Sequence, residues 1–133
     1  MATTRIIDRQ KIKVASTFMG VTSIGAANKH EFGVRPGTEI LRMVAHTITA
    51  FNCGGTGTAT LTVTDGTTTF VNAVDVESTG SETVTGVPKY YPTGGTISCT
   101  ITEVVDTAAA TLGEVMISYE YIIRGNGDAG LEE

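Results

Sequence analysis

The chain has 133 residues, which suits one domain, and it carries 9 Lys and Arg against 14 Asp and Glu, a formal net charge of −5. This acidity argues against nucleic acid as the main partner, because binding to phosphates needs a surplus of Lys and Arg on one face. No apolar run is long enough to span a membrane, and the charged N-terminus lacks the apolar core of a signal peptide, so we expect a protein made in the cytoplasm without a secretion signal.

Charged residues make up only 17% of the chain, below the roughly 25% typical of soluble domains. Thr, Ser, Asn and Gly must therefore supply much of the polar surface. Thr is β-branched and half polar, which suits the exposed face of a strand. The composition favours a β protein that packs against neighbours.

We expect an N-terminal arm over residues 1–11, a single β-sandwich domain over 12–124, and a flexible acidic tail over 125–133. The arm is the most basic part of the chain, and a frayed terminus is the alternative interpretation. An arm of this composition would lie on an acidic partner surface. The residues that would make this contact are Arg5, Ile6, Ile7, Arg9, Lys11 and Lys13.

The first strand is expected from Lys11 to Phe18, with Ile12 and Val14 on one side. After an irregular segment, a short strand at 30–34 and a turn at 35–38 lead to the longest expected strand, 39–51. Its apolar residues do not share one parity, which predicts either two covered faces or a bulge. A helix is the runner-up there, and the β-branched run at 47–49 disfavours it.

The segment 58–64 alternates cleanly, with Ala59, Leu61 and Val63 on one side and threonines on the other. This period of two predicts a strand with one buried and one exposed face. Asp65-Gly66 follows and predicts a two-residue hairpin turn, since Gly takes a positive φ without steric cost.

The second half of the chain predicts more strands separated by turns. We expect the strands at 71–76, 82–87, 96–103 and 114–123, a loop at 88–95, and a connection at 106–112. Seven side chains are predicted to lie in the core: Leu61, Val63, Ile97, Ile101, Val115, Ile117 and Tyr119. About eight strands with no secure helix predict an antiparallel β-sandwich that is jelly-roll-like.

No local motif predicts catalysis, a cofactor or a metal. The two histidines, His30 and His46, lack a flanking nucleophile motif. The Gly-rich segment 53–57 lacks the Lys of a phosphate-binding loop, and Asp75-Val76-Glu77 is only a fragment of a calcium loop. Cys99 is expected to be a small buried side chain, with a bridge to Cys53 as the alternative.

Tyr90 and Tyr91 form an aromatic pair in the expected 88–95 loop. They could form a platform that stacks on a sugar ring. Packing against a neighbouring subunit is favoured instead, because Tyr is enriched at interfaces and the chain has no Trp.

The span from Ile40 to Ile123 resembles a family of small virion proteins of tailed bacteriophages. The resemblance rests on a strand ending Thr49-Ala50-Phe51, the strand Gly57-Thr58-Ala59-Thr60-Leu61-Thr62-Val63, the turn Asp65-Gly66, and the strand from Gly113 to Tyr121. It implies a jelly-roll-like decoration or cement protein, often trimeric, on the outside of a capsid. The expected partners are then the major capsid protein and other copies of this chain.

Two alternatives stay open at this point. One is a phage tail or fibre module that binds a host glycan, which would need an aromatic or acidic pocket. The other is a cytoplasmic β-sandwich binding domain unrelated to virions. All three are non-enzymatic.

Overall fold

The computed structural model describes residues 11–82 and 84–124, and over these it contains nine strands, two single turns of 3-10 helix and no α-helix. The strands are β1 (Lys13–Gly20), β2 (His30–Val34), β3 (Thr38–Thr49), β4 (Thr58–Thr64), β5 (Thr69–Asp75), β6 (Gly80–Glu82), β7 (Lys89–Tyr91), β8 (Gly95–Val104) and β9 (Glu114–Ile123). The 3-10 turns are η1 (Val21–Ser23) and η2 (Ala26–Asn28), which join β1 to β2.

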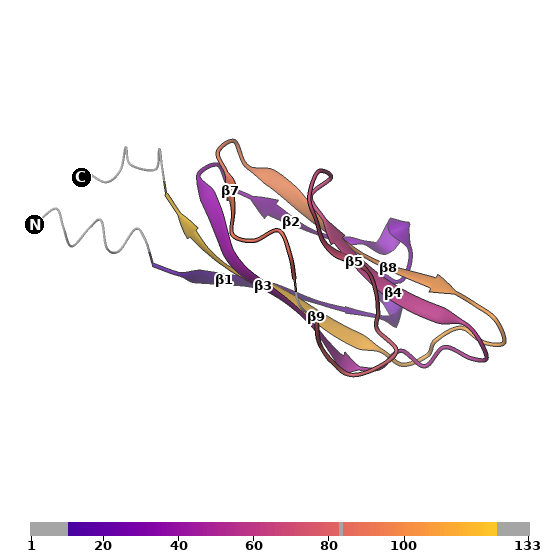
Figure 1. Ribbon diagram of the computed structural model, residues 1–133. Helices are drawn as coiled ribbons and strands as arrows, with labels where there is room; N and C mark the ends of the chain where they lie inside the picture. The colour runs from indigo at the N-terminus through magenta and orange to yellow at the C-terminus, as the bar shows by residue number, and fades with distance from the viewer. Residues whose placement is uncertain (1–10, 83, 125–133) are drawn as a thin grey trace, which may run out of the picture.

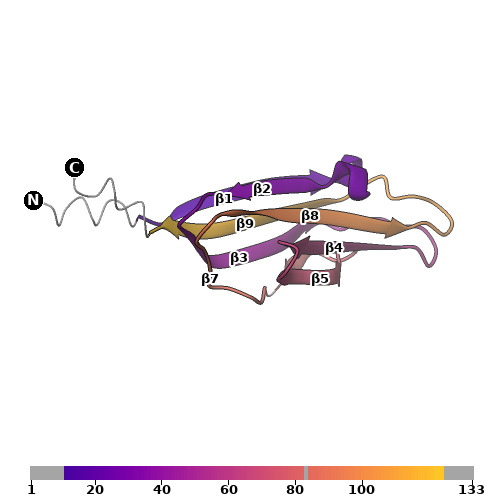
Figure 2. The same cartoon turned by 90° about the horizontal axis from the view of Figure 1, so that it is seen from above.

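The strands form two antiparallel sheets that pack face to face as a sandwich (Figure 1). One sheet has the order β1-β9-β3-β6, with β7 also paired to β3, and the other has the order β2-β8-β4-β5. β1 and β2 lie along one long edge of the sandwich, and β5 and β7 lie along the other (Figure 2). The predicted all-β sandwich is confirmed.

The core lies between the sheets. All seven side chains predicted to be buried are buried, and six of them are fully inaccessible: Leu61, Val63, Ile97, Ile101, Val115 and Ile117. In β4 the apolar side chains face the core, while Thr58, Thr60, Thr62 and Thr64 line the outer face. Cys99 is buried, and both cysteines are free thiols rather than a bridge.

The mixed parity of the longest strand is explained by a bulge. The β3–β9 register shifts between Ile40 and Arg42, so Leu41 has no partner on β9. Because of this extra residue, the buried positions change from even-numbered to odd-numbered residues. Ile40 is buried before the bulge, and Met43 and Ala45 are buried after it. A second shift lies between Thr47 and Thr49.

Three local predictions were wrong in detail. The β4–β5 connection spans four residues, Asp65–Thr68, rather than two, because the Asp65 side chain holds the longer turn through the backbone amides of Thr67 and Thr68. The expected 82–87 strand lies earlier, as β6. The 88–95 loop contains β7, since three residues between its prolines are enough to pair with β3.

The side of the first strand that carries Ile12 and Val14 is the exposed one. Ile12 and Val14 are 62% and 65% exposed, whereas Met19 is 1% exposed. Ala15, Thr17 and Met19 therefore form the inner row of β1. Val14, Ser16 and Phe18 form its outer row. Among the described residues, no helix is long and apolar enough to cross a bilayer.

Candidate interaction surface

The two ends of the sandwich differ in charge. The end at which the described chain begins and finishes, here called the terminal end, comprises residues 11–13, 35–39, 65–68, 89–94 and 124 (Figure 1). It holds five cations against the two carboxylates Glu39 and Asp65, the cations being Lys11, Lys13, Arg35, Lys89 and Arg124. The opposite end, here called the loop end, comprises residues 52–57, 75–79 and 103–114. It holds five carboxylates and no Lys or Arg: Asp75, Glu77, Glu103, Asp106 and Glu114.

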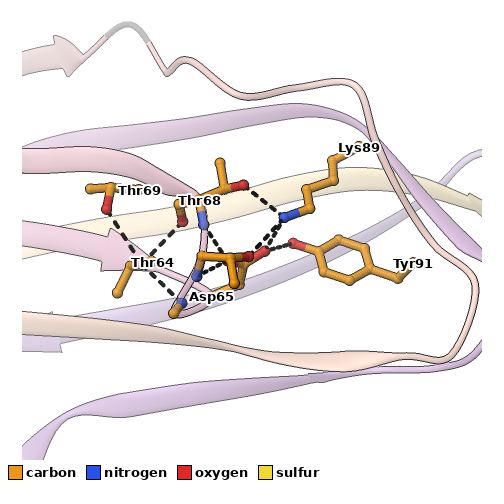
Figure 3. A network of polar contacts seen from close by, with 8 residues as sticks. Thr64, Asp65, Thr68, Thr69, Lys89 and Tyr91 are labelled. Carbon is orange, nitrogen blue, oxygen red and sulfur yellow. Dashed lines mark hydrogen bonds and ion pairs between the residues drawn. The ribbon is translucent and has the colours of Figure 1, made fainter.

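A polar network at the terminal end fastens the two sheets together (Figure 3). Asp65, with a side chain 4% exposed, follows β4, while Lys89 and Tyr91 belong to β7 and so to the opposite sheet. One Asp65 carboxylate oxygen accepts hydrogen bonds from Lys89 Nζ at 2.5 Å and from the Tyr91 hydroxyl at 2.8 Å. The other accepts from the amides of Thr67 and Thr68 at 2.8 and 2.6 Å. We call Asp65, Lys89 and Tyr91 the clasp.

The clasp keeps Asp65 ionised. Burial on its own would raise the pKa of this carboxyl, but the hydrogen bonds from Lys89, the two backbone amides and Tyr91 outweigh it and hold the pKa well below its usual range. The pKa of Tyr91 is raised, first by burial and then by its bond to the Asp65 carboxylate. The side chains of Lys89 and Tyr91 on β7 thus bind Asp65 of the other sheet and join the two sheets.

Tyr90 and Tyr91, neighbours on β7, point to opposite sides of the strand. Tyr90 is 42% exposed and pairs across the strands with Glu39, whereas Tyr91 is 6% exposed and points inward to Asp65. Lys89 Nζ also lies 5.2 Å from the centre of the Tyr91 ring, within the range of a cation–π contact. Tyr90 alone of the two presents a broad aromatic surface to a partner.

At the loop end, side chains hold an exposed connection in place. Asn52 accepts hydrogen bonds from the amides of Thr111 and Leu112, both at 2.8 Å. Asp106 accepts one from the Thr56 amide at 3.0 Å, and Glu103 accepts one from the Ala110 amide at 2.6 Å. Large apolar side chains are nevertheless exposed at the end of β8, Val104, and in the β8–β9 loop, Val105 and Leu112.

The histidines serve as links between elements. The His30 ring lies between the hydroxyls of Thr17, at 2.8 Å, and Ser23, at 3.3 Å, and so connects β2 to β1 and η1. His46 bonds the Ser81 hydroxyl at 2.7 Å. Over residues 11–82 and 84–124, no three His, Cys, Asp or Glu side chains gather closely enough to hold a metal ion.

The predicted partner-binding residues are only partly within the described structure. Arg5, Ile6, Ile7 and Arg9 lie outside the described residues. Lys11 and Lys13 lie at the terminal end, as do Tyr90 and Tyr91. Sequence reasoning missed the exposed apolar pair Val14 and Phe18, 65% and 54% exposed. No signal in the sequence distinguished the two rows of this strand, because both contain apolar residues.

Comparisons with known proteins show a likeness to a solved structure but to no family model. No protein-family model matches the chain, and no curated protein matches it. A solved structure described as the cyanophage Pam1 capsid asymmetric unit contains a chain of similar fold, with a TM-score of 0.64 and 20% identity over 86% of each chain. At this identity the likeness establishes a shared fold.

Proposed function

We propose that this chain is a non-enzymatic structural protein of a tailed-phage virion, a decoration or cement protein that binds the outside of the assembled head and stabilises it. The observation that carries the proposal is the fold. The same sandwich, over 86% of both chains, occurs in a structure described as a capsid asymmetric unit. The resemblance of the Ile40–Ile123 segment to small phage virion proteins points the same way.

The charge distribution supports an orientation on the head. An acidic shell surface would attract the terminal end, with its five cations against two carboxylates, and would repel the loop end. The contacts to the major capsid protein would then come from Arg5, Ile6, Ile7, Arg9, Lys11 and Lys13, with Tyr90 beside them, while Tyr91 anchors β7 through its bond to Asp65. In this account residues 1–11 act as an arm beside the 12–124 domain.

We further propose that the protein acts as a homotrimer on the virion exterior. Each arm then needs to bind only weakly, because three arms on one particle engage together and their effective affinity multiplies. A low density of charge and a Thr-rich surface suit such close packing between copies.

The glycan-binding alternative is less well supported. A sugar platform built from Tyr90 and Tyr91 would need both rings on the surface. Tyr91 is 6% exposed and its hydroxyl is bonded to Asp65, which leaves Tyr90 as the stacking surface of the pair.

Co-sedimentation with heads prepared without this protein tests the proposal. Arg5→Ser with Arg9→Ser should lower occupancy strongly, and deletion of residues 2–11 should abolish binding. The matched control is Lys29→Ser with Arg42→Ser, which removes two exposed cations outside the terminal end. Wild-type protein that fails to bind heads would overturn the proposed function. Equal loss in both double variants would overturn the orientation.

A further inference from the structure

β1 is a free edge strand. Over the described residues, β9 is the one strand that pairs with it, in an unbroken antiparallel register from Lys13–Tyr121 to Gly20–Glu114. In an edge strand, alternate residues direct their backbone N–H and C=O groups away from the sheet. These groups can form backbone hydrogen bonds with a further strand.

This edge also lacks the features that usually prevent edge pairing. The segment Val14–Met19 has no charge, no Pro, no Gly and no bulge. Its outer row instead exposes Val14 and Phe18. The other edges are shorter or interrupted: β2 has five residues and contains Glu31 and Gly33, while β6 and β7 have three residues each.

We propose that β1 pairs with β1 of a second copy of this chain. The two strands run antiparallel about a two-fold axis at Ser16, and the β1-β9-β3 sheets of the two molecules become one continuous sheet. The proposal concerns a contact between copies of the unattached protein, because the antiparallel pair points the two terminal ends in opposite directions, and it does not depend on whether the protein binds a phage head.

The side chains of β1 select this register. With the axis at Ser16, Val14 lies opposite Phe18 of the second copy on the outer face, and the same pair occurs again on the other side of the axis. Aromatic and β-branched side chains are favourable cross-strand partners. Moving the axis to Ala15 or Thr17 would set Val14 or Phe18 against Ser16 instead. Lys13 lies opposite Met19, so like charges do not meet.

The charges of the two ends favour the same arrangement. In an antiparallel pair, the terminal end of each molecule lies beside the loop end of the other. The charged residues nearest to β1 are Lys11 and Lys13 at the terminal end and Glu114 at the loop end, so cations lie towards a carboxylate on both sides of the axis. The contact is local as well, because Gly20 at the end of β1 is paired with Glu114, and Lys13 begins the strand that would lie alongside. Complementary ends disfavour the parallel arrangement.

Analytical ultracentrifugation tests the proposal. Val14→Lys with Phe18→Lys sets Lys against Lys across the axis and should halve the mass of the particle. A dimer becomes a monomer, or a hexamer built from two trimers becomes a trimer. The matched control, Ile48→Lys with Asn72→Lys, adds the same charge at two exposed positions away from β1, on β3 and on the opposite edge strand β5, and it should keep the wild-type mass.

Two further variants test the register itself. Val14→Glu with Phe18→Lys sets Glu against Lys on both sides of the axis and should restore the wild-type mass. Ser16→Cys should give a disulfide-linked dimer under mild oxidation, while wild-type protein, with Cys53 half-buried and Cys99 buried, should not.

An unchanged mass in the double Lys variant, a wild-type monomer, or a Ser16→Cys variant that stays uncrosslinked would each overturn the proposal. A trimer unaffected by the double Lys change would do so while leaving the proposed function standing.

Discussion

The two long edges of the sandwich differ in how far they are protected against pairing with a further strand. At the β5 edge, the β4–β5 register shifts twice, and Ala73 has a φ of 51°. The following segment also covers that edge, since the Thr85 amide donates to the Phe70 carbonyl at 3.3 Å. At the other edge, β1 keeps its register over all eight residues. Edge protection is therefore a local property of sequence, and within residues 11–82 and 84–124 the β5 side has it while β1 does not.

The clasp belongs to the protected side. Asp65 ends β4 beside the start of β5, and Lys89 and Tyr91 reach it from β7 in the other sheet. Both sheets are therefore tied together where β5 begins. On the β1 side, the sheets are linked by the hydrogen bonds of His30 with Thr17 and Ser23 and by the edge-to-face contact of Phe32 with Tyr119, with no ion pair among these residues. We expect the β5 side to matter more for folding and the β1 side more for association.

The core should matter more than either edge. Leu61→Ala removes a fully buried side chain from the centre of β4 and should lower the free energy of unfolding by about 3–4 kcal/mol. Thr60→Ala, one residue away on the outer face, should cost less than about 1 kcal/mol. Denaturant titration measures both, and a small effect of Leu61→Ala would contradict the face assignment of β4.

Neutralising the clasp should have the next largest effect. Asp65→Asn keeps the shape of the side chain but leaves the Lys89 ammonium without its carboxylate, and should cost about 2–3 kcal/mol. Asp106→Asn makes the same change on an exposed loop and should cost less than about 0.5 kcal/mol. Equal costs would show that the clasp does not favour the β5 side.

The clasp should also account for part of the loss of folding stability at acidic pH. The folded pKa of Asp65 is lowered, so its contribution to stability is fully present above the ordinary carboxyl pKa of about 3.9 and is lost as pH falls towards the folded value. Wild-type protein should thus lose more stability than Asp65→Asn as pH falls from neutral to below about 4. Parallel curves of unfolding free energy against pH would refute this.

Backbone conformation at the β5 edge allows a stabilising change. Ala73 occupies the left-handed region, which is unfavourable for a residue with a Cβ. Ala73→Gly should raise the free energy of unfolding by about 0.5–1 kcal/mol, after the greater entropy of Gly in the unfolded chain is deducted. Asn72→Gly, at a neighbouring position without a positive φ, should lower it by a similar amount. Thermal unfolding distinguishes the two signs.

The smallest effect on folding should come from the β1 edge. Val14→Lys on a side chain that is 65% exposed should change the free energy of unfolding of the separated subunit by less than about 0.5 kcal/mol. Dilute protein, at a concentration where copies do not associate, is the sample for this titration. A loss comparable to that of Asp65→Asn would mean that Val14 supports the fold rather than a contact.

The fold was predictable where one residue pattern dominated. Alternation in 58–64 fixed the buried face of β4, and the mixed parity of 39–51 indicated the bulge that the structure places at Leu41. β7 was not predicted because it has only three residues and Pro and Gly flank it, which is typical of a loop. It forms a strand because it pairs with β3, which is distant in the sequence. The buried face of β1 could not be assigned from the sequence because both of its rows contain apolar residues, and Val14 and Phe18 are large although exposed.

The candidate surface was less predictable than the fold. Basic residues near the N-terminus were visible in the sequence, but the charge difference between the two ends arises when the strands bring residues from 11 to 124 together. Tyr90 and Tyr91 looked equivalent as neighbours, and a strand then turned one outward and one towards Asp65. Such differences depend on tertiary pairing, which short-range patterns do not encode.

Hydrogen exchange measured at low and high protein concentration tests the difference between the two edges most directly. The outward-facing amides within Val14–Met19 should exchange more slowly as concentration rises, because they become paired with the second copy, while amides of β5 keep their rates. The Val14→Lys, Phe18→Lys variant should abolish that dependence. Equal rates for β1 at both concentrations, or slowing confined to β5, would contradict the central claim that β1 is the edge through which copies associate.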